Sequence, residues 1–492
     1  MTSELNVKWG NLSGDALVRK LNETYDTVKQ WKRNIFKLPS GAAGKAFLRE
    51  LTNIVNHFNT PTPLEPVAMK LIMIFCPLML QKPFRTSKTR DHTQHLAENL
   101  KMWEAGNLAG LLRKGTAIQK RLVNSKQKKE DDINAFTRHM LSGRVSPALR
   151  QISKKKAPML EGTPEVIAEL KIKHPHGRET KDGTLLFGPY NRPEDVVFQS
   201  IDSKAIYNAA IETHGSAGPS GIDAEGWQRF LCSRAFGQEA ENLCTAIAKL
   251  AQKLATESVD PAYLSAFTAC RLIALDKQPG IRPVGVGELL RRIVGKAIAK
   301  LVKRDVAKST APLQSCGGVR GGAEAAVHAL RRIWEDGDTE AVLLVDASNA
   351  FNRLNRKAAL QNTSIICPEL STYLNNTYDE PSRLLIANTE GEEILSMEGT
   401  TQGDNLAMAF YACSVIPMIQ RTRESSSAKS IWYADDGAGG GKLSDILSFW
   451  EFLKADGAGY GYFTNPGKSI LIVKPEHELR AKQLFPDVQI AR

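Results

Sequence analysis

The sequence predicts an α+β fold from three features of its residue pattern. Apolar residues recur at three- and four-residue spacing over Asp15–Phe36 and Leu96–Val123, which predicts amphipathic helices. From about residue 200, helical patterns alternate with short apolar runs of strand length, Ala341–Val345 and Ile431–Ala434. Both runs are followed directly by acidic residues. We therefore expect helices first, and later a small sheet with charged strand ends.

The chain has 492 residues and a formal net charge of +12, and its basic excess lies in the first 200 positions. We expect a basic, mainly α-helical region over residues 1–155, a linker over 156–199, where proline and glycine interrupt the periodicity, and an α+β region over 200–475. Residues 476–492 would begin a truncated C-terminal region. A cluster of basic residues in this region is consistent with phosphate binding. A solvated helix face would explain the same residues equally well. The members of the cluster are Arg113, Lys114, Lys120, Arg121, Lys126, Lys128, Lys129 and Lys154–Lys156.

Composition excludes several classes of protein. The longest apolar run, Leu71–Leu80, is far shorter than the roughly 20 residues of a membrane-spanning helix, so we expect buried core and no membrane partner. Residues Met1–Gly10 lack the apolar stretch of a secretory signal. The seven cysteines form no C-x-x-C pair, which argues for reduced thiols and against a zinc module. These features predict an intracellular protein, cytoplasmic or nuclear or both.

Acidic residues at the strand ends carry the predicted chemistry. Asp346 follows the first apolar run, and Asp435 and Asp436 follow the second. A turn between two strands would present both adjacent carboxylates at the tip of a hairpin. Such carboxylates repel one another unless a cation neutralises them, and oxygen ligands suit Mg²⁺, of which a pair promotes phosphoryl transfer. A solvated Asp-Asp turn without function is the alternative that this pattern alone leaves open.

Four segments resemble, in the same order, the motifs of the reverse transcriptase family, the right-hand polymerases of retroelements. They are Asp346–Phe351, an Asp after a strand with an aromatic residue five positions on; Glu398–Ala407, with a Gln-Gly pair; Tyr433–Asp436, a Tyr-x-Asp-Asp box; and Gly461–Ser469, with a lysine near its end. Four motifs in one order are far more specific than any one of them.

The resemblance continues upstream and covers about residues 200–475. Arg271–Lys277 and Arg282–Val284 look like the strands of the fingers β-hairpin, and a helix rich in leucine and isoleucine follows them. Gly218–Asp223 is similar to the Gly-Pro-x-Gly segment of retroelement enzymes without long terminal repeats. The resemblance implies polymerase fingers and a palm with an antiparallel sheet, preceded by the basic helical region.

The resemblance also assigns roles to catalytic residues. Asp346 and Asp435 would ligate two Mg²⁺ ions, for which Mn²⁺ could substitute, and Asp436 would lie beside them. The carbonyl of Ala347 would complete a metal shell. Lys468 would protonate the departing pyrophosphate, with a solvated surface lysine as the alternative.

Five further residues would contact substrate. Phe351 would lie under the sugar and exclude a 2′-hydroxyl, although ordinary core is the alternative for this residue. Gln402 and Gly403 would approach the nascent base pair closely, which a glycine permits. Arg282 and Lys277 would bind the triphosphate, and a solvated lysine is the alternative for Lys277.

The implied function is RNA-directed DNA polymerisation, with an RNA template, a DNA primer and deoxynucleoside triphosphates as partners. An RNA polymerase would need a polar residue at position 351. Asn352, Asn405 and Ala407 depart from residues common in the family, but none of them is a metal ligand. The short stretch after Lys468 leaves no room for a thumb. The second hypothesis is therefore a catalytically idle, nucleic-acid-binding remnant of a retroelement.

Overall fold

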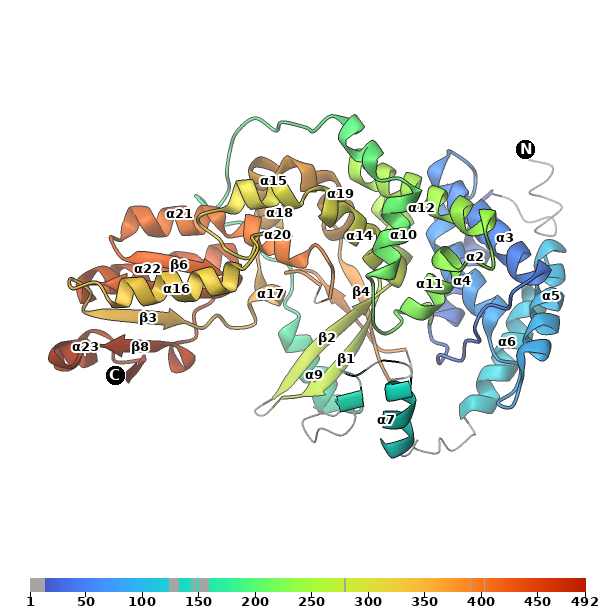
Figure 1. The fold of residues 1–492 in the computed structure, drawn as a ribbon, viewed down its shortest axis with the longest axis horizontal. Helices are drawn as coiled ribbons and strands as arrows, with labels where there is room; N and C mark the ends of the chain where they lie inside the picture. The colour runs from blue at the N-terminus through green and yellow to red at the C-terminus, as the bar shows by residue number, and fades with distance from the viewer. Residues whose placement is uncertain are drawn as a thin grey trace.

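The computed structural model describes residues 14–123, 132–141, 159–277, 280–389, 391–401 and 403–492, with single positions between 142 and 158. It is a mixed α+β structure with two small mixed sheets. Figure 1 shows the N-terminal helices at one end of the molecule and the five-stranded sheet at the other. Within the described ranges, no helix is both long and apolar enough to cross a membrane.

The N-terminal part is helical, as predicted. Its helices are α2 (Gly14–Val28), α3 (Ala42–Asn59), α4 (Ala68–Leu80), α5 (Thr89–Glu104), α6 (Leu108–Val123) and α7 (Asp132–Leu141). The periodic segment 96–123 is two helices, because Gly106 between them has a φ of 69°, a left-handed conformation that favours glycine. Apart from Lys70, α4 is buried along its whole length, so the longest apolar run is core.

Of the predicted linker over 156–199, the described residues 159–199 form an arm that is hydrogen-bonded to the rest of the chain. It contains helix α9 (Pro164–Lys173), which is N-capped by the hydroxyl of Thr163, and a short 3₁₀ helix, η2 (Asp195–Ser200). Between them, Asn362 Nδ2 donates to the carbonyl of Thr184 at 2.9 Å, and the Arg178 amide donates to Glu398 Oε1 at 2.6 Å. The arm therefore lies against the C-terminal half of the chain.

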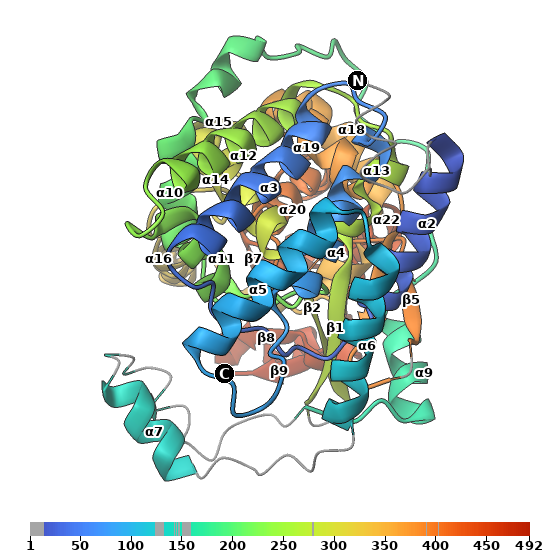
Figure 2. The ribbon, with the colours of Figure 1, turned by 90° about the vertical axis from the view of Figure 1, so that its right-hand side faces the viewer.

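Four helices connect the N-terminal part to the sheets. They are α10 (Ser203–Ile211), α11 (Ala224–Cys232), α12 (Gln238–Thr256) and α13 (Pro261–Thr268). Helix α12 packs against α3 from the N-terminal part and against α10 (Figure 2). One cluster of buried apolar side chains runs from α2 through these helices to the five-stranded sheet. The N-terminal helices thus share their core with the rest of the chain.

The four-stranded sheet is built on the predicted hairpin. Strands β1 (Cys270–Asp276) and β2 (Ile281–Gly287) are antiparallel, and the helix expected after them is α14 (Leu289–Leu301). The sheet order is β2-β1-β4-β5, with β4 (Ser382–Ile386) parallel to β1 and β5 (Glu393–Ser396) antiparallel to β4. Helix α15 (Lys303–Thr310) follows α14.

The five-stranded sheet has the order β6-β7-β3-β8-β9. Its strands are β3 (Ala341–Val345), β6 (Lys429–Tyr433), β7 (Asp436–Gly441), β8 (Ile470–Val473) and β9 (Gln489–Ala491). The expectation of an antiparallel sheet is correct for the first three pairings and wrong for the last, because β9 returns beside β8 in parallel after helix α23 (Glu478–Leu484). The sheet is therefore mixed.

Helices cover both faces of this sheet. On β7, a Cβ added at Gly439 would lie 3.0 Å from Phe449, and one at Gly440 would lie 2.5 Å from Ile333. Neighbouring strand residues face opposite sides, so α22 and α16 pack on opposite faces. The glycine run of β7 is what allows this close approach.

The remaining helices are α16 (Gly322–Trp334), α17 (Ala350–Arg353), α18 (Arg356–Ile366), α19 (Pro368–Tyr378), α20 (Ala407–Ser414), α21 (Ile416–Ser425) and α22 (Leu443–Tyr460).

Candidate active site at the end of the five-stranded sheet

The predicted hairpin that carries the adjacent acids is present. Strands β6 and β7 pair up to Tyr433 and Asp436, which leaves Ala434 and Asp435 as the two turn residues. Ala434 has a φ of 54°, which costs a residue with a Cβ some free energy and must be offset by the surrounding contacts.

Gln314 supplies those contacts. Its Nε2 donates to the Ala434 carbonyl at 3.0 Å, and its Oε1 accepts from the Ala434 amide at 2.9 Å. The side chain of Gln314 is fully buried. The sequence does not point to this residue, because it lies 120 positions before the turn in a loop without a recognisable motif.

Asp346 lies at the same end of the sheet as the turn. The register pairs Val345 with Gly437, so continuing it by one position sets Asp346 opposite Asp436. Asn465 Nδ2 donates to Asp346 Oδ2 at 3.1 Å, and the Asp346 amide donates to Ser469 Oγ at 3.1 Å. Asn465 therefore orients the carboxylate, and Ser469 holds the backbone of the same residue.

The three carboxylates act on one another electrostatically. Burial raises the pKa of Asp435, and the charges of Asp436 and Asp346 raise it further. Burial also raises the pKa of Asp436, which is further raised by the charge of Asp346. Both shifts run in the direction expected where like charges share a site. The strand ends thus bring Asp346 near the turn, where its charge disfavours the ionisation of Asp435 and Asp436.

Ala347 and Lys468 belong to the same region. Ala347 forms an isolated antiparallel bridge with Thr464. The hydrogen bonds of this bridge are made by the residues on either side of Ala347: the Ser348 amide donates to the Phe463 carbonyl, and the Asp346 carbonyl accepts from the Asn465 amide. Because carbonyls alternate along a strand, the Ala347 carbonyl is directed to the side of β3 on which β7 lies. Lys468 is exposed and directly precedes Ser469.

Phe351 is part of an aromatic chain that leads to the acids. Its ring stacks on Tyr411 with centroids 4.5 Å apart and an interplanar angle of 25°. The Tyr462 hydroxyl donates to the carbonyl of Asp435 at 3.0 Å. Burial, followed by the negative charge of the nearby Tyr462 and Asp435, raises the pKa of Tyr411 well above its usual range. Phe351 is therefore packed on the core, beside a tyrosine whose pKa the charge of Asp435 helps to raise.

The segment with the Gln-Gly pair lies against Phe351. The Thr400 amide donates to the Phe351 carbonyl at 2.6 Å. Gly403 has a φ of 92°, and a Cβ placed there would lie 3.3 Å from the carbonyl oxygen of Gly285 on β2. Gly403 thus lies close to β2 of the four-stranded sheet. Gln402 lies outside the described residues.

The two residues predicted to bind the triphosphate, Lys277 and Arg282, lie on the β1–β2 hairpin of the other sheet. The Lys277 amide donates to the Gly280 carbonyl at the hairpin turn at 3.0 Å, and Arg282 is exposed at the start of β2. Across the described residues, no hydrogen bond or ion pair joins either side chain to Asp346, Asp435 or Asp436. The structure does not bring these two cations into direct contact with the acids.

The oxygen donors suit a hard cation, although they do not form a finished ligand set. In the part of the chain that the structure describes, no three His, Cys, Asp or Glu side chains are grouped closely enough to hold a metal ion. The chemistry of the donors nevertheless fits Mg²⁺, because closely spaced carboxylates with raised pKa values gain from a divalent cation.

The basic cluster falls largely outside the described residues, which exclude Lys126, Lys128, Lys129 and Lys154–Lys156. On α6, Lys114 Nζ contacts Glu98 Oε2 at 3.2 Å and Asn99 Oδ1 at 2.8 Å. This lysine therefore already has partners within the N-terminal helices.

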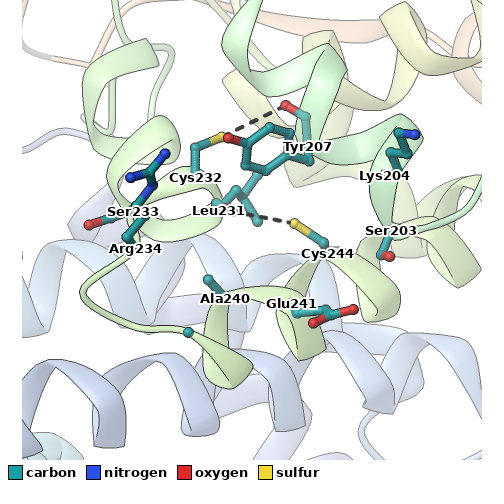
Figure 3. Close-up of a pocket in the computed structure, with 11 residues that line it drawn as sticks. Ser203, Lys204, Tyr207, Leu231, Cys232, Ser233, Arg234, Ala240, Glu241 and Cys244 are labelled. Carbon is teal, nitrogen blue, oxygen red and sulfur yellow. Dashed lines mark hydrogen bonds between the residues drawn. The ribbon is translucent and has the colours of Figure 1, made fainter.

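A separate cavity of about 330 Å³ lies among α10, α11 and α12 (Figure 3). Its two thiols donate to backbone carbonyls, Cys232 to Tyr207 at 3.7 Å and Cys244 to Leu231 at 3.6 Å. Burial raises the pKa of Cys232 to about 11 and that of Cys244 to about 12. Thiols that stay protonated at neutral pH are poor nucleophiles, so this cavity offers no comparable chemistry.

Comparison of the sequence with protein-family models found no match, and no curated protein matches the chain.

Proposed function

We propose that this chain is an RNA-directed DNA polymerase that extends a DNA primer on an RNA template. The observation that carries the proposal is the position of Asp346 opposite the Asp435–Asp436 turn at one end of the sheet. An acid whose pKa is raised by burial and by the charge of a neighbouring acid, as for Asp435 and Asp436, is typical of functional sites. The Tyr-x-Asp-Asp sequence of the turn adds the resemblance to reverse transcriptases.

In the proposed reaction, the primer 3′-hydroxyl gives its proton to solvent water and its oxygen attacks the α-phosphate of a deoxynucleoside triphosphate. One P–O bond forms, and the bond to pyrophosphate breaks. Asp346 and Asp435 would hold two Mg²⁺ ions, with Asp436 and the carbonyl of Ala347 beside them. Bound there, the ions would lower the pKa of the attacking hydroxyl and neutralise the charge of the leaving group.

The protein's own groups would orient the reactants. Asn465 and Ser469 hold Asp346 in one position. The ring of Phe351 would lie against the sugar and disfavour a 2′-hydroxyl, since it offers no hydrogen-bond partner to a polar group. Lys468 would give a proton to the departing pyrophosphate. Such an enzyme would act inside the cell, in the cytoplasm or the nucleus, where RNA templates occur.

Primer extension on an RNA template with deoxynucleotides and Mg²⁺ tests the proposal. We expect extension by the natural chain, none by Asp435→Ala, and strong preference over ribonucleotides. Binding of primer–template should be measured in parallel. Absence of extension, with salt-dependent binding that survives Asp435→Ala, would replace the proposal by a catalytically idle, nucleic-acid-binding remnant.

A further inference from the structure

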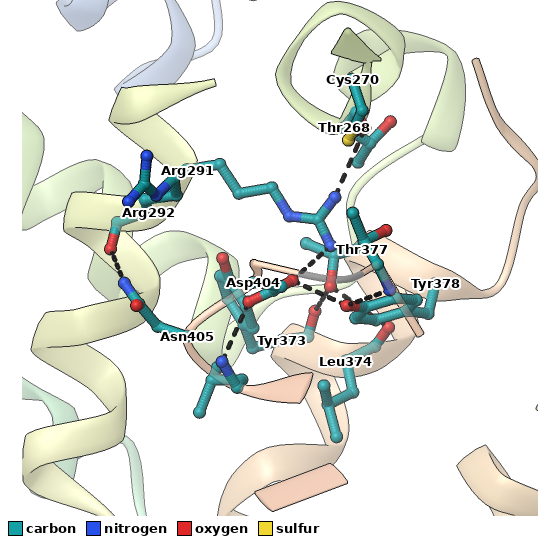
Figure 4. A network of polar contacts seen from close by, with 12 residues as sticks. Thr268, Cys270, Arg291, Arg292, Tyr373, Leu374, Thr377, Tyr378, Asp404 and Asn405 are labelled. Atoms are coloured by element: carbon teal, nitrogen blue, oxygen red, sulfur yellow. Dashed lines mark hydrogen bonds and ion pairs between the residues drawn. The ribbon is translucent and has the colours of Figure 1, made fainter. Parts of the chain in front are cut away.

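A buried ion pair holds the residue that directly follows Gly403. Arg291 Nη2 on α14 lies 2.6 Å from Asp404 Oδ2, and the two side chains are only 2% and 3% exposed. The hydroxyl of Tyr378 at the end of α19 donates to the same carboxylate oxygen at 2.7 Å. Figure 4 shows these three side chains converging from three elements. Removing two charges from water is costly, and only good geometry repays that cost.

A second carboxylate holds the other end of the loop. Glu398 Oε2 accepts from the Arg356 amide at 2.8 Å. The guanidinium of Arg356 donates to the carbonyls of Ser396, Glu398 and Gly399 at 2.7–3.0 Å. Buried charged groups therefore hold the segment 398–404 at Glu398 and again at Asp404.

Tyr378 joins these two ends. Its ring lies between the two arginines, with the Cζ of Arg291 at 5.0 Å and that of Arg356 at 5.6 Å from the ring centroid. Its hydroxyl also accepts from the Thr401 amide at 3.3 Å. One side chain thus contacts the ion pair, the second arginine and the backbone of the loop just before Gly403.

The loop contacts both strand β2 and the backbone of Phe351. Gly403 approaches the Gly285 carbonyl on β2, and the Thr400 amide is bonded to the Phe351 carbonyl. A shift of this loop would therefore change the surface that lies between the β1–β2 hairpin and the Phe351 ring. Because this surface would receive the incoming nucleotide, such a shift would weaken nucleotide binding more than it would slow the chemical step.

We propose that Asp404, Arg291 and Tyr378 are positioning residues that fix the 399–403 loop and so set the fit of the incoming deoxynucleotide. They do this by holding Gly403 at a defined distance from β2. This inference rests on the proposed polymerase function and adds to it a determinant of nucleotide affinity that lies outside the acid cluster.

Steady-state extension by single-deoxynucleotide addition tests the inference in the full-length chain, with Asp404→Asn, Tyr378→Phe and Arg291→Lys as variants. Tyr378→Phe is the mildest change, because it keeps the ion pair and removes only the hydroxyl. Glu288→Gln is the matched control. It also alters a buried carboxylate, at the start of α14, but its partners are the amide and hydroxyl of Ser220 and not the loop.

We expect the KM for the deoxynucleotide to rise at least about tenfold in Asp404→Asn, and less in Tyr378→Phe, while kcat and primer–template affinity change little. Hydrogen exchange of the 399–404 amides should accelerate in both variants and stay unchanged in Glu288→Gln. An unchanged KM, or equal KM increases in the variants and the control, would overturn the inference while the polymerase proposal stands. Absence of any extension by the natural chain would overturn both.

Discussion

The side-chain amide of Gln314 bonds both backbone groups of Ala434: Gln314 Nε2 donates to the Ala434 carbonyl, and Gln314 Oε1 accepts from the Ala434 amide. This fixes a left-handed residue directly before Asp435. The clamp connects a loop before β3 to the turn of the β6–β7 hairpin. It therefore links the position of the Asp435 carboxylate to a residue that has no part in the proposed chemistry.

Replacing Gln314 should disturb the turn more than the fold. Gln314→Met keeps the side-chain volume and removes both side-chain hydrogen bonds to the amide and carbonyl of Ala434, which should cost about 2 kcal/mol of unfolding free energy. Extension activity should fall at least about tenfold, because Asp435 loses its fixed position. Urea unfolding and primer extension check both effects. Gln238→Met on the exposed side of α12 is the control, and equal activity in the two variants would contradict the role of the clamp.

Removing one acid should stabilise the chain while it abolishes activity. The raised pKa values of Asp435 and Asp436 show that the folded state disfavours their charges, so Asp435→Asn should raise the unfolding free energy by about 1 kcal/mol in metal-free buffer at pH 7. Thermal unfolding measures this gain. Asp338→Asn, on an exposed turn, should leave both stability and activity unchanged. A loss of stability in Asp435→Asn would mean that the acids do not repel one another.

Much of this arrangement could be predicted from local sequence, and the remainder depends on distant contacts. The run Ala341–Val345 and the Asp-Asp turn were predictable because apolar strands with charged ends are a local pattern. The break at Gly106 was not, since the apolar spacing continues across it. The pairing of β9 with β8, the Gln314 clamp and the Arg291–Asp404 pair join residues 19 to 120 positions apart, and single-sequence patterns do not encode such contacts.

The buried Glu288 should make stability depend on pH. Burial raises its pKa from 4.5 to about 7, so the folded chain holds this proton more tightly than the unfolded chain does. The associated stability is complete below pH 4.5 and is lost as the pH rises through 7, up to about 3 kcal/mol. Urea midpoints at pH 5, 6, 7 and 8 should therefore fall more steeply for the natural chain than for Glu288→Gln. Parallel curves for the two proteins would contradict this assignment.

Phe351 should govern the choice of sugar. Its ring is held by Tyr411, and its carbonyl by the Thr400 amide. Phe351→Ala opens space beside the sugar, so the preference for deoxynucleotides over ribonucleotides should fall about 10- to 100-fold. Competition between the two nucleotides in primer extension measures this ratio. The exposed Phe187→Ala is the control, and an unchanged ratio in Phe351→Ala would show that the ring serves only as core.

Asp346 and the Asp435–Asp436 turn are proposed to form one catalytic centre. Single-turnover incorporation of one deoxynucleotide, with RNA template, DNA primer and Mg²⁺, should be compared among the natural chain, Asp346→Asn, Asp435→Asn and Asp338→Asn. We expect incorporation by the natural chain and by Asp338→Asn, and none by the other two despite intact folding and primer–template binding. Incorporation that persists in Asp346→Asn or Asp435→Asn would contradict the proposal.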